Sequence, residues 1–77
     1  MNLDELLACL SPVVARYVRQ ALRHMEQQNV FDAPGVIGGV VAQMRVAESD
    51  VIRSAADRTE YLLRLAFGRR RLQRIGA

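Results

Sequence analysis

Hydrophobic residues recur every three to four positions along most of the chain, a spacing that places apolar side chains on one face of an α-helix. The clearest stripe lies between residues 49 and 68. One face of this helix would carry Ile52, Ala55, Ala56, Thr59, Leu62, Leu63, Ala66 and Phe67. The opposite face carries charges, with Arg53 and Asp57, and Glu60 and Arg64, at the i,i+4 spacing of helix ion pairs. The pattern predicts an amphipathic helix over residues 49–68, with an extension to residue 74 left open.

The first part of the chain predicts helices over residues 3–10 and 12–28. Asn2 suits the N-cap of the first, and Ser11 followed by Pro12 has the pattern of a second helix start. The apolar residues after Pro12 stay in phase with the leucines before it, so one kinked helix is the alternative. The polar face of the second helix carries Arg16, Gln20, Arg23 and Gln27 and is interpreted as a solvated face. His24 lies at its margin and is interpreted as a boundary residue.

A further helix is predicted over residues 34–46, with Asp32 as its N-cap and a turn near residues 46–49 that Ser49 ends as the next N-cap. This helix contains Gly35, Gly38 and Gly39, each of which costs about 0.5–1 kcal/mol relative to Ala inside a helix. The cost predicts a close helix crossing. Met25, Tyr17 or Leu63 is expected to lie over the glycines. A phosphate-binding loop is not indicated, because no Lys-Ser/Thr pair follows the glycines and no strand precedes them.

These elements predict an all-α fold, a small bundle of three to four helices. The helical domain is expected to cover residues 1–68, and residues 69–77 form a basic tail or a helix extension. A chain of 77 residues buries only about 60% of its unfolded surface. Its thin core should therefore gain from a partner or from self-association.

The formal charge of +3 is unevenly distributed. Residues 1–68 hold seven arginines against eight acidic residues, a net charge of −1, whereas the tail holds four arginines and no acid. These four are Arg69, Arg70, Arg71 and Arg74. Such a cluster can neutralise phosphates of a nucleic acid, but it also suits a solubilising tail at the negative end of a helix dipole. Both interpretations stay open.

Little in the chain indicates catalysis. No Ser-His-Asp, Cys-His or paired-carboxylate arrangement stands out, so no enzyme, cofactor or metal site is expected. The single Cys9 cannot form an intramolecular disulfide and is expected to be a buried or half-buried thiol in a reducing compartment. No signal segment is evident, and the apolar run at residues 33–42 is too short to span a membrane. A cytoplasmic protein without membrane contact is expected.

A second apolar stripe carries the main functional hypothesis. Tyr61, Leu65 and Leu72 fall on a flank that the predicted core face does not cover, and Arg58 lies beside them. Exposed apolar stripes usually mark contacts. These four residues are therefore predicted to form a protein interface of a small non-enzymatic regulator or adaptor, as a homodimer or with another protein.

Residues 40–55 suggest an alternative. Ser49, Asp50, Ile52, Arg53 and Ala55 match the Ser-Glu-x-Ile-Arg-x-Ala pattern that opens the second helix of ribbon-helix-helix repressors, and the segment resembles that family over about a fifth of the chain. The resemblance implies a DNA-binding transcriptional regulator, to which the arginine tail would contribute. However, residues 24–30 lack the alternation of the DNA-reading strand, and Arg45 stands where a small turn residue is expected. The family's base contacts therefore do not carry over to this chain.

Overall fold

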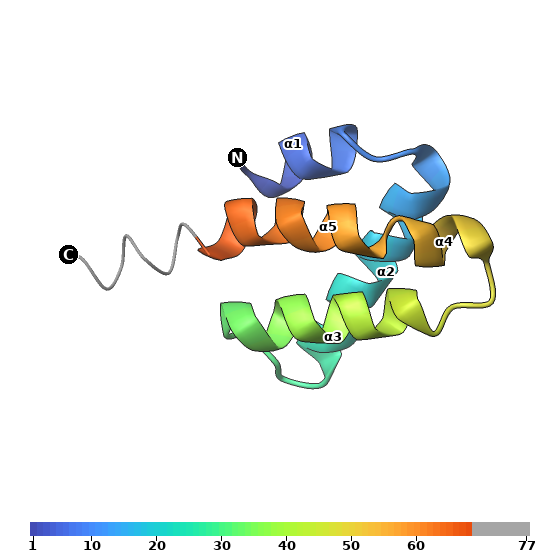
Figure 1. Ribbon diagram of the computed structural model, residues 1–77. Helices are drawn as coiled ribbons and strands as arrows, with labels where there is room; N and C mark the ends of the chain where they lie inside the picture. Colours follow the sequence, from blue (N-terminus) through green and yellow to red (C-terminus); the bar gives the residue numbers. More distant parts are fainter. Residues whose placement is uncertain (69–77) are drawn as a thin grey trace.

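The computed structural model describes residues 1–68, of which 78% are helical and none forms a strand. The predicted all-α class is confirmed. In chain order the elements are α1 (Leu3–Ala8), α2 (Pro12–Gln27), α3 (Ala33–Arg45), α4 (Asp50–Ser54), α5 (Ala56–Leu63) and a π-helical turn η1 (Arg64–Gly68), shown in Figure 1.

The four helix starts predicted from capping residues are confirmed. The side chain of Asn2 accepts a hydrogen bond from the backbone N–H of Glu5 at 2.9 Å, and that of Asp32 accepts one from Gly35 at 2.8 Å. Ser11 and Ser49 cap α2 and α4 in the same way, each at 3.4 Å. The chain leaves the helix between α1 and α2. Two separate helices are therefore found rather than one kinked helix.

The end of α2 is a Schellman motif built on Asn29. This residue has a left-handed φ of 63°, which Asn tolerates better than most residues. The N–H of Val30 donates to the carbonyl of Met25 at 2.9 Å, and the N–H of Asn29 donates to Glu26 at 3.0 Å. Val30 is half-buried against the core, so the turn is closed by an apolar contact as well as by hydrogen bonds.

The prediction of one continuous helix over residues 49–68 is wrong. A turn at Ala55 separates α4 from α5, and η1 continues α5 with a wider π-helical turn. The break changes the side-chain spacing, and the predicted Arg53–Asp57 pair does not form. Arg53 instead pairs with Asp50 and donates to the carbonyl of Glu48 at 3.0 Å. The predicted pair of Glu60 and Arg64 lies within α5 and its extension and is present at 2.7 Å.

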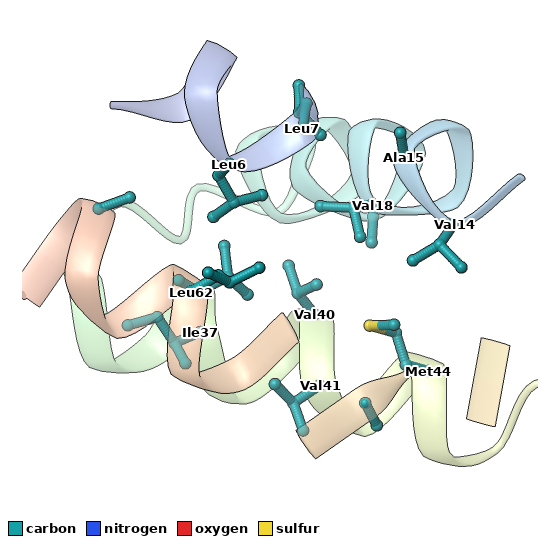
Figure 2. Close-up of a cluster of buried hydrophobic side chains, with 14 of the residues drawn as sticks. Leu6, Leu7, Val14, Ala15, Val18, Ile37, Val40, Val41, Met44 and Leu62 are labelled. Carbon is teal, nitrogen blue, oxygen red and sulfur yellow. The ribbon is translucent and has the colours of Figure 1, made fainter. Parts of the chain in front are cut away.

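Helix α3 is the centre of the packing, since it contacts α2, α4, α5 and η1. In Figure 1, α5 lies between α1 and α3, and α2 crosses behind them. The side chains that point inward form one apolar cluster (Figure 2). Its most deeply buried apolar members are Leu6, Val18, Val40, Met44 and Leu63. All of them come from residues that the helical pattern assigns to apolar faces, so the sequence periodicity accounts for the core.

The expected close crossing over the glycines is found at Gly39 alone. A side chain at Gly39 would collide with the thioether of Met25, so this glycine lets α2 and α3 approach closely. Gly35 is needed for a different reason, because a Cβ there would lie 2.9 Å from the capping carboxylate of Asp32. Gly38 faces open space, and no contact within the described residues explains it.

Candidate functional site

The outward side of α5 is the candidate site. Ala56, Thr59, Leu62, Leu63 and Ala66 are turned into the core, and four residues on the opposite side of the helix and its extension are exposed. We call these the α5 face: Asp57, Arg58, Tyr61 and Arg64. The side chain of Tyr61 is 63% exposed, and the two arginines lie one turn to either side of it. An amphipathic ring between two guanidinium groups thus faces solvent from an ordered helix.

The structure keeps only part of the predicted interface together. Tyr61 and Arg58 are exposed on the α5 face, as their spacing predicts. Leu65 is half-buried and packs partly against the core, in a turn that contacts α3. The exposed apolar stripe is therefore narrower than expected. Leu72 lies outside the described residues, and so do the tail arginines Arg69, Arg70, Arg71 and Arg74.

An ion-pair network borders the α5 face. Arg45, the last residue of α3, donates to Asp57 at 3.2 Å and to Glu60 at 3.1 Å. Glu60 also accepts two hydrogen bonds from Arg64, at 3.3 and 2.7 Å. The network fastens α5 to α3 and holds the Arg64 guanidinium in place. Sequence reasoning missed the role of Arg45, because its partners lie 12 and 15 positions away and belong to no local pattern.

The same network shifts the titration of Glu60. The hydrogen bond from Arg64 lowers the pKa of this carboxyl group below its ordinary value, and the positive charges of Arg64 and Arg45 act in the same direction. Partial desolvation opposes them without cancelling the effect. Glu60 therefore stays ionised at acidic pH values where a free glutamate begins to take up a proton.

Beneath the α5 face, Thr59 is completely buried. Its hydroxyl group has no hydrogen-bond partner among residues 1–68. A buried hydroxyl without a partner costs folding free energy. Because the group is closed off from solvent, it contributes nothing to chemistry at the surface.

The remaining candidates from the sequence give no chemical site. Cys9 is exposed, which contradicts the prediction of a buried or half-buried thiol. It follows the last residue of α1 as a C-cap, two positions past Leu7, the second of the two leucines that turn into the core. His24 is exposed on α2, as a residue at the helix margin would be. In the part of the chain that the structure describes, no group of three or more His, Cys, Asp or Glu side chains could hold a metal ion. Nor is any helix among residues 1–68 long and apolar enough to cross a membrane.

The resemblance of residues 40–55 to ribbon-helix-helix repressors is matched in part by the geometry. Helices α3 and α4 contact each other and are joined by a short turn that ends at Ser49. The strand of a ribbon-helix-helix protein is not present in the described residues, since α2 and a loop precede α3. No model of a protein family, no curated protein and no solved structure matches the chain.

Proposed function

We propose that the protein is a small non-enzymatic regulator or adaptor that binds a protein chain through the α5 face, and that its first partner is a second copy of itself. The exposure of Tyr61 on an ordered helix, between Arg58 and Arg64, is the observation that carries this proposal.

The composition of the α5 face suits a binding hot spot. Tyrosine and arginine are enriched among the residues that dominate binding energy at protein interfaces. Tyrosine also contributes a large contact area with few rotatable bonds, so less conformational entropy is lost on binding. The network of Arg45, Glu60 and Arg64 holds one of the flanking arginines before a partner arrives, and such preorganisation lowers the cost of association.

Other exposed apolar residues are less suited to this role. Phe31 is 71% exposed, but it lies in the loop between α2 and α3 rather than on a helix. Val46 and Val51 are exposed on either side of the turn before α4, and valine is under-represented among hot-spot residues. Phe31 is therefore a matched control, as an aromatic side chain of similar exposure outside the α5 face.

The test is the oligomeric state of the full chain, measured by sedimentation equilibrium over a range of concentrations. We expect a monomer–dimer equilibrium in which Tyr61→Ala raises the dissociation constant at least tenfold, the usual effect of removing a hot-spot side chain (about 1.4 kcal/mol or more). Phe31→Ala is expected to leave the constant unchanged. Circular dichroism checks that both variants keep their helices. A chain that stays monomeric throughout, or equal weakening by both variants, would contradict the self-association.

Binding to a different protein is measured separately. Immobilised wild-type chain, Tyr61→Ala and Phe31→Ala are compared for recovery of proteins from nuclease-treated lysate. We expect partners that the Phe31→Ala variant retains and the Tyr61→Ala variant loses. Recovery that does not depend on Tyr61 would place the contact elsewhere on the molecule.

A further inference from the structure

The outward side of α2 carries three of the seven arginines among residues 1–68. Five residues of this helix are turned into the core, namely Val14, Ala15, Val18, Ala21 and Met25. We call the exposed residues opposite them the α2 face: Arg16, Arg19, Gln20, Arg23 and Gln27. At 3.6 residues per turn they fall within roughly a third of the helix circumference. Three guanidinium and two amide groups thus share one solvent-facing surface.

The arginines of the α2 face differ from most others in their pairing. Arg45, Arg53 and Arg64 each lie within ion-pair distance of a carboxylate. Among residues 1–68, no ion pair involves Arg16, Arg19 or Arg23. All eight acidic side chains of the protein belong to this part of the chain, so the tail has none to offer. The exposed Glu26 follows Arg23 by one turn but forms no ion pair with it, so the α2 face keeps an excess of positive charge.

This arrangement works against the stability of α2. Arg16 and Arg19, and Arg19 and Arg23, are like charges at i,i+3 and i,i+4, and each such pair costs about 0.2–0.5 kcal/mol in an isolated helix. The first turn of α2 also lacks the acidic residue that would suit its dipole. A polyanion bound to the α2 face would remove this repulsion.

We propose that the α2 face binds the phosphate backbone of a nucleic acid duplex. Guanidinium groups form bidentate hydrogen bonds with phosphate oxygens, and the amides of Gln20 and Gln27 add neutral donors at the same surface. Arg16 and Arg23 lie about 10.5 Å apart along the helix axis. Measured along a duplex axis, that length covers about three base-pair steps at ~3.4 Å each. Binding is electrostatic and tolerant of sequence.

The chemistry of the α2 face favours nucleic acid over two other anionic partners. None of its five residues is aromatic, so its arginines have no tyrosine or tryptophan beside them, in contrast to Arg58 and Arg64 on the α5 face. The exposed apolar residue nearby is Val13, in the first turn. A membrane-surface helix inserts its apolar side between lipids, but the apolar side of α2 forms part of the core. The proposal is independent of the proposed function, which rests on a different helix.

The test is a fluorescence anisotropy titration of the full chain against a labelled 20-base-pair DNA duplex at several salt concentrations. Two double variants remove the same charge: Arg16→Gln with Arg23→Gln on the α2 face, and Arg45→Gln with Arg53→Gln elsewhere. The plot of log K against log salt has a negative slope, and losing two phosphate contacts makes this slope shallower by about 1.8. We expect this decrease, and at least a tenfold loss of affinity at low salt, for the α2 pair alone. Circular dichroism confirms that both variants are folded.

Each other outcome overturns the proposal in a recognisable way. If the wild-type chain does not bind the duplex at low salt, the proposal is wrong. If the α2 double variant binds with wild-type affinity, the residues that bind the duplex lie outside the α2 face. Equal losses in both double variants would show a response to net charge rather than to the α2 face. Polyglutamate or anionic vesicles that bind as tightly as the duplex, with the same loss in the α2 variant, would assign the α2 face to an acidic protein or a lipid surface. Failure of the α5 proposal leaves these results unaffected, because Tyr61→Ala keeps the α2 face intact.

Discussion

Helices α2 and α5 bury their apolar faces in the same core, but they are held in place by different means. Helix α2 has a capping serine at its start and a Schellman motif at its end, so both ends are fixed by neighbouring residues. Helix α5 begins at Ala56, its N-cap Ala55 offers no side-chain cap, and Arg45 links it to α3. The ends of α2 are thus specified by local sequence, whereas the position of α5 depends on tertiary contacts.

The α5 face and the α2 face also differ in how their arginines are paired. On the α5 side, Arg64 is held by Glu60, and the carboxylates are shared with Arg45. The arginines of the α2 face have no carboxylate partner within residues 1–68. Arg64 is therefore paired with a carboxylate at the α5 face, whereas the arginines of the α2 face repel one another. This contrast underlies the separate functions proposed for the two surfaces.

The largest effect is expected at Thr59, where the interior of α5 differs most from that of α2. The buried residues of α2 are all apolar, whereas Thr59 buries a hydroxyl without a partner in the described residues. Thr59→Val keeps the shape and removes the hydroxyl, so it should raise the free energy of unfolding by about 1–3 kcal/mol. The midpoint of thermal unfolding should rise by about 4–8 °C per kcal/mol. Urea denaturation followed by circular dichroism measures the change.

Thr59→Ser is the matched control, because it keeps the hydroxyl and loses a buried methyl group. It should lower stability by about 1 kcal/mol. If Thr59→Val proves destabilising instead, the hydroxyl has a partner in solution, and the contrast between the two helix interiors disappears.

The second largest effect is expected at Asn29, in the Schellman motif that ends α2. Asn29→Ala keeps a β-carbon in the left-handed conformation but removes the short polar side chain that lets Asn tolerate it, and should cost about 1 kcal/mol of unfolding free energy. Asn29→Gly fits this conformation without strain and should match or exceed the wild-type stability. The two variants are compared by urea denaturation. Equal stabilities would show that the helix end is not fixed by this residue.

The contrast between α2 and α5 also explains what the sequence could predict. A capping residue bonds to the backbone three positions later, so local sequence predicts the helix starts at Asn2, Ser11, Asp32 and Ser49. The apolar periodicity predicts the core. No helix-breaking Pro or Gly lies at the break at Ala55, and the apolar stripe continues across it, so the sequence favours one long helix. The Arg45 contacts and the partial burial of Leu65 depend on how α3 meets α5, which no local pattern encodes.

A smaller effect compares two arginines directly. Arg45→Gln removes the pairs with Asp57 and Glu60 and should lower stability by about 0.2–1 kcal/mol, the range of exposed ion pairs. Arg19→Gln removes the same charge from α2 and relieves two like-charge neighbours, so it should raise stability by a few tenths of a kcal/mol. Urea denaturation at low salt measures both, and about 1 M salt should shrink the difference. Changes of the same sign would refute the contrast between the two faces.

The smallest effect is a pH dependence carried by Glu60. Because its pKa is lowered in the folded protein, the unfolded chain binds the proton more readily, and ionised Glu60 stabilises the fold. This contribution is fully present above pH ~4.3, the ordinary glutamate pKa, and is lost as the pH falls through the lowered pKa of the folded state. The stability advantage of the wild-type chain over Glu60→Gln should therefore shrink as the pH drops below about 4 and vanish in stronger acid. An advantage at Glu60 that persists unchanged in acid would mean that the carboxylate charge is not what fastens α5 to α3.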